Sequence, residues 1–304
     1  MTRVPLAGTS SRRDDSFHER ILGMTNHVTD SPSTRRPAVA VLSREAPRRP
    51  LKIIEADGVA EAIVWPGMGA QWRSLHRIVL GPQGRTIELA HESEAVYFVR
   101  TGTADVTGDD STERLSLVAG SMVHIGPRQR YRFVADNAGA EILGGPCPPD
   151  DAMYHDAPSD PARSQTVADA QRAIRTFHCD SPSHVLPLIS SDARLVVWPG
   201  VGGADMANLN YVAMQPGEAN TPHAHPTSED TIYILEGAGS IEDITNGAVL
   251  TFHAGDVVHV PPGVRHAVRA DQGERVVSFG GPCPPDLTLL GHAIEVPTHP
   301  PLGR

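Results

Sequence analysis

The feature of this chain that most limits its fold is an internal repeat. The seven residues Gly144-GPCPP-Asp150 recur unchanged as Gly280-GPCPP-Asp286, an offset of 280 − 144 = 136. A second pair of segments, which begin VWPG at residues 64 and 197, has an offset of 197 − 64 = 133. Solenoid repeats are much shorter, so these offsets indicate two tandem domains. Each copy has ordinary domain size, and the 304 residues accommodate two domains and a tail.

The body of the chain has the pattern of an all-β protein. Short runs rich in Val, Ile, Tyr and Phe, such as 96–99, 231–235 and 275–279, are separated by turn-forming residues. The 28 Gly and 27 Pro fit many turns. The stretch 166–177 instead predicts a short helix in the connection between the copies. We expect a first β-domain over residues 51–150, a linker with this helix over 151–179, and a second β-domain over 180–295.

Residues 1–50 differ in composition from the rest. They contain nine Arg and five Asp or Glu, about +4, whereas the whole chain carries −10, so residues 51–304 carry −10 − 4 = −14. The segment shows no sustained apolar period, which predicts a disordered tail, dispensable for folding and metal content up to about residue 45. The acidic body argues against nucleic acid as a partner.

Apolar runs and cysteines in the sequence indicate the cellular compartment. No apolar run is long enough to span a membrane, and no apolar region follows the arginine pair at residues 12–13, which argues against an export signal. The three cysteines are Cys147, Cys179 and Cys283. Their number implies no disulfide framework, and Cys147 and Cys283 are expected to lie far apart in separate domains. We therefore expect a cytoplasmic protein.

Histidines and carboxylates with the spacing of metal ligands lie in the second copy. His223 and His225 are one residue apart, which places both on one face of an extended strand. His266 follows a Pro-Pro-Gly turn, and a carboxylate is available at Glu229 or Asp230. These two neighbours point to opposite faces of a regular strand, so only one should be a ligand. Three imidazoles and one carboxylate suit iron, manganese, nickel or zinc.

This pair of motifs resembles the cupin superfamily. The anchors that carry the resemblance are Gly217, His223, His225, Gly237, Gly255, Pro261, Gly263 and His266. Counting back from Gly237 in the family pattern selects Asp230, whereas counting forward from His225 selects Glu229; we favour Asp230, although the family usually has Glu. The resemblance implies that each copy is a cupin barrel, a double-stranded β-helix or jelly roll.

The first copy lacks the ligand set. It aligns Glu88, Ala90 and Ala95 with His223, His225 and Asp230, and Tyr131 with His266. We therefore expect one divalent ion per chain, in the second barrel, with iron(II) favoured over manganese, nickel or zinc. The first barrel is expected to be structural and to supply an interface within the chain or in a homodimer.

The resemblance does not fix the reaction. The first hypothesis is an iron(II)-dependent oxygenase that acts on a small organic molecule. The alternatives are a non-redox manganese or zinc enzyme, namely a decarboxylase, isomerase or hydrolase, and a small-molecule binding or regulatory barrel. Asn208, Asn210 and Tyr211, on the strand before the two histidines, are candidate substrate-binding residues.

Overall fold

The computed structural model describes residues 36–108, 114–155, 173–200 and 202–295. The chain divides into two units, Met1–Arg36 and Pro37–Arg304, and the strands of the described residues lie in the second unit. The predicted tail over residues 1–35 and most of the predicted linker helix lie outside the described residues. Among the described residues, no helix combines the length and the apolar character needed to cross a membrane.

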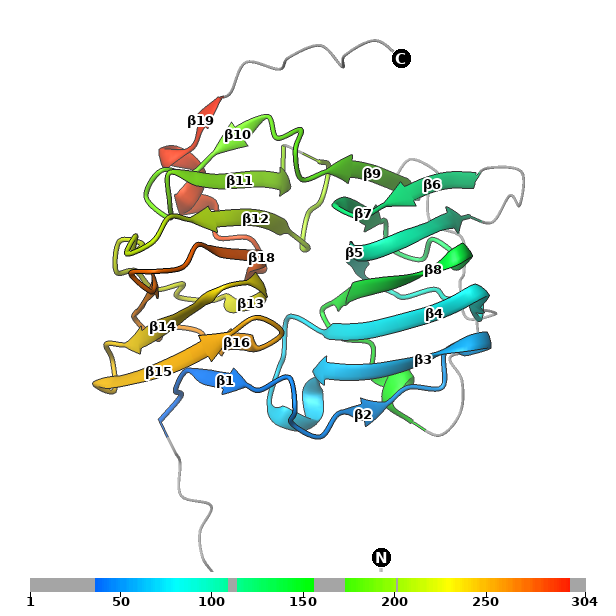
Figure 1. Ribbon diagram of the computed structural model, residues 1–304, viewed down its shortest axis with the longest axis horizontal. Coiled ribbons are helices and arrows are strands. Elements are labelled where there is room, and N and C mark those ends of the chain that lie inside the picture. Colours follow the sequence, from blue (N-terminus) through cyan, green and yellow to red (C-terminus); the bar gives the residue numbers. More distant parts are fainter. Residues whose placement is uncertain (1–35, 109–113, 156–172, 201, 296–304) are drawn as a thin grey trace, which may run out of the picture. The chain divides into compact units, whose positions relative to one another are not determined.

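The first barrel is antiparallel (Figure 1). Its strands are β2 (Arg49–Pro50), β3 (Ile54–Val64), β4 (Leu75–Thr86), β5 (Glu94–Thr107), β6 (Arg114–Val118), β7 (Ser121–Ile125) and β8 (Arg132–Cys147). The strand order is β2-β3-β4-β8-β5-β7-β9, with β6 beside β5; the last strand, β9 (Ile174–His178), comes from the segment before the second barrel. Two short 3-10 turns, η1 (Pro66–Met68) and η2 (Asp151–Tyr154), follow β3 and β8.

The second barrel repeats this plan. Its strands are β10 (His184–Val185), β11 (Asp192–Val197), β12 (Leu209–Met214), β13 (Glu229–Glu236), β14 (Ala238–Asp243), β15 (Ala248–His253), β16 (Val257–Val260), β17 (His266–Ala270), β18 (Val276–Cys283) and β19 (Ile294–Glu295). One sheet has the order β1-β16-β13-β18-β12-β11-β10-β19 and the other β15-β14-β17. The 3-10 turn η4 (Leu287–His292) follows β18. The chain is therefore an all-β protein of two tandem barrels.

Each barrel contributes one strand to the other. Strand β1 (Ala40–Leu42) precedes the first barrel but pairs with β16 of the second, and β9 (Ile174–His178) pairs with β7 of the first (Figure 1). The pairs are Ala40 with His259 and Arg175 with His124. Arg175 follows Ala40 by 175 − 40 = 135 residues, and His259 follows His124 by 259 − 124 = 135 residues. The two strand pairs are therefore equivalent in the sequence repeat.

This exchange corrects two of the expected boundaries. Residues 39–44 of the predicted tail belong to the second barrel: the N–H of Val39 donates to Asp243 at 3.0 Å, and that of Arg44 to Asp256 at 2.9 Å. Residues 174–177, predicted to end the linker helix, are in β9 instead. In both places cross-strand pairing with a distant segment decides the backbone conformation, and local composition does not reveal it.

Two carboxylates connect the barrels reciprocally. Glu94 of the first barrel accepts hydrogen bonds from the backbone N–H groups of Asp205, Met206 and Ala207, at 2.7 to 3.1 Å. Glu229 of the second barrel accepts from those of Gln71, Trp72 and Arg73, at 2.7 to 3.3 Å. Each glutamate thus satisfies buried and partly buried loop N–H groups of the opposite barrel.

Side chains of both barrels share a core between these contacts. Phe98 stacks on Phe279 with ring centroids 4.6 Å apart, and Tyr233 also stacks on Phe279, with centroids 5.4 Å apart. The repeat-equivalent Cys147 and Cys283 are fully buried in this core and lie close enough to shift each other's pKa, so the expectation that they lie far apart is wrong. Burial raises the pKa of Cys283 well above its ordinary value.

Candidate metal centre

Four side chains converge inside the second barrel. The donor atoms of His223, His225, Asp230 and His266 all lie within 4.8 Å of one another. Asp230 Oδ2 is 3.8 Å from His225 Nε2 and 3.7 Å from His266 Nε2, which is too far for hydrogen bonds. Opposite ligands of one first-row ion are about 4 Å apart, so the cluster is close to the size of a metal site.

The histidine rings are oriented by oxygen acceptors on their outer side. His223 Nδ1 lies 2.8 Å from the carbonyl oxygen of Thr221, and His266 Nδ1 lies 3.0 Å from that of Val264. His225 Nδ1 lies 2.9 Å from Asp286 Oδ2. An acceptor at Nδ1 fixes the proton there and leaves Nε2 with its lone pair directed inward.

Three inward atoms of the cluster lack a partner. Among the described residues, His225 Nε2, His266 Nε2 and Asp230 Oδ1 are buried and accept or donate no hydrogen bond. Such buried polar atoms are costly unless they are satisfied. A divalent cation would satisfy all three, so the residues present fit a metal ion.

Two local features of the backbone bring the ligands together. His223 and His266 form an isolated antiparallel bridge, with N–O distances of 3.1 and 2.8 Å. The turn before His266 places Gly263 at φ +77°, a conformation that glycine adopts without a Cβ penalty. From there the N–H of Gly263 donates to the carbonyl oxygen of His225 at 2.8 Å. The Pro-Pro-Gly turn therefore fixes the loop that carries His225.

The surroundings of His223 and Asp230 favour the protonation states that these two side chains have as metal ligands. Burial, together with the neighbouring His266 and His225, lowers the pKa of His223 to about 4, so this imidazole is neutral at pH 7. Burial acts to raise the pKa of Asp230, but His225 and His266 outweigh it and hold that pKa well below its usual range. Neutral imidazoles and an ionised carboxylate are the forms that bind metal ions.

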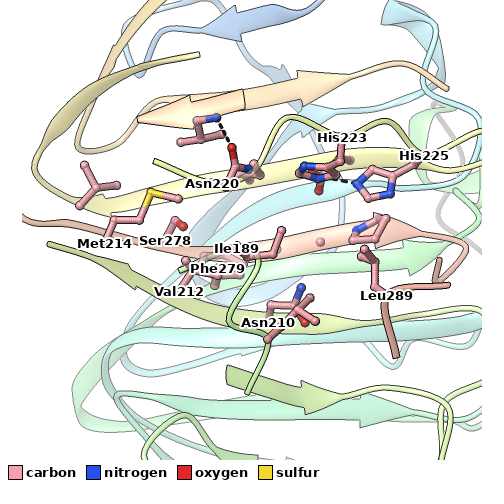
Figure 2. A pocket seen from close by; sticks show the side chains of 18 residues that line it. Ile189, Asn210, Val212, Met214, Asn220, His223, His225, Ser278, Phe279 and Leu289 are labelled. Atoms are coloured by element: carbon pink, nitrogen blue, oxygen red, sulfur yellow. Dashed lines mark hydrogen bonds and ion pairs between the residues drawn. The ribbon is translucent and has the colours of Figure 1, made fainter. Parts of the chain in front are cut away.

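A pocket opens onto the cluster and is mostly apolar (Figure 2). Its apolar lining residues are Leu186, Ile189, Val212, Met214, Ile232, Val268, Val276, Phe279 and Leu289. Asn210, Asn220 and Ser278 add neutral polar groups, and none of the described lining residues is Arg or Lys. The pocket volume is about 50 Å³, room for roughly four water molecules.

Asp286 links the cluster to the segment beside the pocket. One carboxylate oxygen contacts His225 Nδ1, and the other accepts from the N–H and hydroxyl of Thr288 at 3.1 and 2.7 Å. Asp286 thereby caps η4, whose Leu289 lines the pocket. The motif that ends at Asp286 also occurs in the first copy, which lacks the ligand set, so its recurrence does not mark Asp286 as part of the site. Only its contact with His225 Nδ1, which sequence spacing does not reveal, identifies Asp286 as part of the site.

Three of the residues predicted from the sequence lie outside the cluster and its pocket. Glu229 points to the other barrel, because adjacent strand residues face opposite sides. Asn208 is buried between Arg73 and the carbonyl oxygen of Pro282. Tyr211 lies under the guanidinium of Arg194, 5.2 Å from its ring. Of the candidate substrate-binding residues, only Asn210 lines the pocket.

The first barrel fills the equivalent position with its own side chains. The bridge between Leu89 and Tyr131 matches that between His223 and His266, so Leu89 and His91, not Glu88 and Ala90, correspond to the two histidines. His91 keeps the outer contact, with Nδ1 2.8 Å from Asp150 Oδ2.

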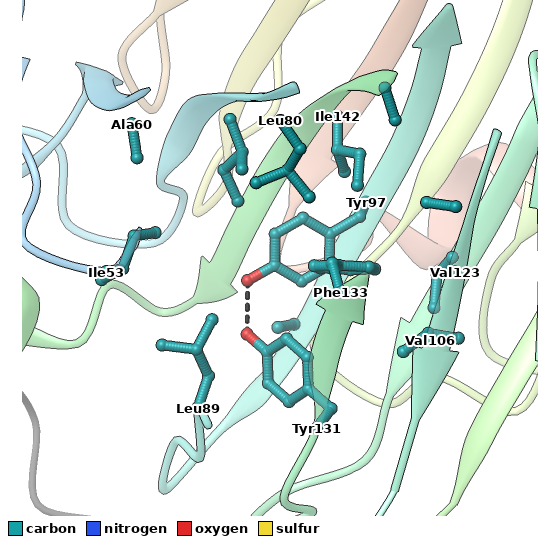
Figure 3. Close-up of a cluster of buried hydrophobic side chains, with 14 of the residues drawn as sticks. Ile53, Ala60, Leu80, Leu89, Tyr97, Val106, Val123, Tyr131, Phe133 and Ile142 are labelled. Atoms are coloured by element: carbon teal, nitrogen blue, oxygen red, sulfur yellow. Dashed lines mark hydrogen bonds between the residues drawn. The ribbon is translucent and has the colours of Figure 1, made fainter. Parts of the chain in front are cut away.

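Tyrosines occupy the space where a metal would lie. His91 Nε2 contacts the hydroxyl of Tyr131 at 2.7 Å, and that hydroxyl bonds to Tyr97 at 2.5 Å (Figure 3). Ala95, opposite Ile125 as Asp230 is opposite Val260, contributes no carboxylate. The one remaining imidazole is therefore already satisfied.

A second group, His178, Cys179 and Asp180, is a weaker metal candidate. Both ring nitrogens of His178 already contact backbone atoms, of Asp180 and Ala119. Burial, and then Asp180, raise the pKa of Cys179 to about 11, so its thiol stays protonated at pH 7.

The sequence of this chain is similar to those of several known proteins. The family described as "Cupin domain" matches residues 210–279. The chain is 30% identical over 135 residues to the tetracenomycin polyketide synthase protein TcmJ of Streptomyces glaucescens, covering 44% of this chain and 85% of that protein. It is 30% identical over 103 residues to polyketide synthase CurC of Streptomyces cyaneus, covering 33% and 65%.

Solved structures resemble the whole two-barrel unit. An oxalate decarboxylase mutant from Bacillus subtilis has a TM-score of 0.62 at 14% identity, covering 87% of this chain and 80% of that one. The formate complex of Lactobacillus farciminis oxalate decarboxylase has a TM-score of 0.62 at 17% identity, covering 86% and 89%. At these identities the likeness shows a shared fold.

Proposed function

Since the chain belongs to the cupin superfamily, we propose that it is a metal-dependent enzyme, an iron(II)-dependent oxygenase with its single metal ion in the second barrel. His223, His225, Asp230 and His266 would hold the ion. The observation that carries the proposal is the convergence of the four side chains beside a pocket, with three buried inward atoms that lack a partner among the described residues. Bound there, iron would supply a Lewis acid and a redox centre for dioxygen.

The pocket lining supports oxygenation over acid–base chemistry. Apart from the proposed ligands, the described lining residues include no Asp, Glu, His, Lys, Arg, Tyr or Cys. Decarboxylation and isomerisation depend on a positioned proton donor or acceptor. The donor set equally fits manganese or zinc, so a non-redox metal enzyme is the second candidate.

The lining also supports a substrate class. A small dicarboxylate would place charge in an apolar pocket without an Arg or Lys to pair it, which is costly. We therefore propose an uncharged, largely apolar substrate with oxygen atoms that reach the metal, held by the amide of Asn210. Asn210 Oδ1 already accepts from Trp198 Nε1, which leaves its Nδ2–H groups as donors. TcmJ and CurC are described as polyketide synthase proteins, and a small polyketide-like fragment would have such a largely apolar skeleton with oxygen atoms.

Oxygen uptake tests the proposal. The protein is stripped of metal, reloaded separately with iron(II), manganese(II) or zinc(II), and supplied with catechols, phenols and keto acids. We expect substrate-dependent oxygen uptake with iron alone, its loss in His223→Ala and its retention in the exposed control His253→Ala. Turnover without oxygen uptake would instead identify the non-redox enzyme, and no turnover with any metal would identify a binding barrel.

A further inference from the structure

A second hollow, separate from the metal cluster, carries positive charge. It is bounded by the connection between β1 and β2, by β3, β4 and β5 of the first barrel, and by β13 and the turn before β16 of the second. Its volume is about 380 Å³. Its arginines are Arg44, Arg48, Arg77 and Arg100, and we call it the arginine groove. The proposed oxygenase activity does not use it.

Carboxylates compensate only part of this charge. Glu141 bridges Arg77 at 2.7 Å and Arg100 at 2.9 Å, and Glu61 lies 3.4 Å from Arg77. Arg44 is paired only with an exposed neighbour, Glu45, at 3.9 Å. The body of the protein is acidic overall, so a concentration of arginine here is unusual for this chain.

Arg48 and Tyr233 have unused donors in the groove. Arg48 donates to the carbonyl oxygen of Ser43 at 2.9 Å, and it has no carboxylate within ion-pair distance among the described residues. Tyr233 is only 4% exposed and lines the groove. Its hydroxyl makes no hydrogen bond to any described residue. The hydroxyl can therefore donate a hydrogen bond to a ligand in the groove.

The pseudo-symmetry of the chain provides an internal comparison. A groove of about 330 Å³ lies at the repeat-equivalent place, beside Phe98, which corresponds to Tyr233. The repeat offsets place Cys179, Ser183, Tyr211 and Leu235 where the arginine groove has Arg44, Arg48, Arg77 and Arg100. Of the four arginines, only Arg100 also reaches this second groove. The fold therefore does not itself require arginines at these positions.

We propose that the arginine groove binds a small molecule through a phosphate group. Guanidinium groups donate fork-like pairs of hydrogen bonds that match phosphate oxygens. Here the donors come from three segments of the chain: the β1–β2 connection, the first barrel and Tyr233. Donors on several sides suit a tetrahedral oxyanion better than a planar carboxylate.

Calorimetric titration of the full-length protein with inorganic phosphate at low ionic strength tests this proposal. We expect saturable binding that Arg48→Gln weakens about tenfold, since one charged hydrogen bond is lost. Tyr233→Phe, which removes only the hydroxyl, should weaken it about threefold. Arg85→Gln, an equal charge change on an exposed arginine paired with Glu55, should leave it unchanged. His225→Ala should also leave it unchanged, which separates the groove from the metal cluster.

Several outcomes would overturn the proposal. They are an absence of saturable phosphate binding by the wild-type protein, an equal loss in Arg85→Gln, and unchanged binding in Arg48→Gln and Tyr233→Phe. Citrate binding more tightly than phosphate would overturn the assignment of a phosphate group. Thermal unfolding of each variant guards against misfolding, and Tyr233→Phe keeps the test valid if Arg48→Gln does not fold.

Discussion

Glu94 offers a quantitative test of how the two barrels are held together. Burial acts to raise the pKa of Glu94, but contact with His124 and hydrogen bonds from Ala207 and Asp205 lower it from 4.5 to about 2. A lowering of this size corresponds to about 3 kcal/mol, at about 1.4 kcal/mol per pKa unit. We therefore expect Glu94→Gln to reduce the free energy of unfolding by about 3 kcal/mol at pH 7, because the amide has only one acceptor oxygen for these donors.

The pH dependence has a definite sign. The pKa of Glu94 is lower in the folded protein, so its stabilisation is complete above about pH 4.5 and is lost as the pH falls towards 2. Denaturant unfolding at pH 7 and at pH 3 should therefore show a smaller difference between wild type and Glu94→Gln at the lower pH. Glu55→Gln, on the surface of the first barrel, is the matched control. A Glu94→Gln effect below 1 kcal/mol at pH 7, or one that does not change with pH, would refute this reasoning.

Three further predictions follow from the fold and the pocket. A chain that begins at residue 46 lacks β1, so Val39 and its neighbours no longer pack on the second barrel. Its free energy of unfolding, measured with denaturant, should be about 3 kcal/mol lower than that of the full-length chain. An unchanged free energy of unfolding would contradict the strand exchange. Asp286→Asn should weaken metal binding at least about tenfold, as measured by competition with a chelator, because His225 Nδ1 loses its carboxylate acceptor. The equivalent Asp150→Asn in the first barrel should not weaken it. Equal effects of the two substitutions would refute the role of Asp286. Leu289→Ala should lower KM for bulky substrates by widening the pocket, and an unchanged KM would count against access from that side.

The sequence was sufficient where local periodicity decides the structure. The repeat located both barrels, and the period of a strand brought His223 and His225 to one face. The same period explains why Asp230 reaches the cluster while Glu229 turns to the other barrel.

The sequence alone did not predict the features that depend on contacts between segments far apart in the chain. Strand β1 is three residues long in an Arg- and Pro-rich segment, and only its pairing with β16 makes it a strand. His91 was misaligned by one residue because repeat offsets drift through single insertions. The bridge between Leu89 and Tyr131 and the contact of His91 with Asp150 reveal that His91 matches His225. The contact of Cys147 with Cys283 depends on the packing of the two barrels, which no local pattern encodes.

Metal stoichiometry in a pair of equivalent histidine variants tests the central claim most directly. His225 and His91 occupy corresponding positions in the two barrels, each held at Nδ1 by the aspartate of the repeated motif. After anaerobic loading with iron(II) and dialysis, elemental analysis should give one equivalent per chain for the wild type and for His91→Ala, and none for His225→Ala. Two equivalents in the wild type, loss of metal in His91→Ala, or full retention in His225→Ala would contradict a single metal site in the second barrel.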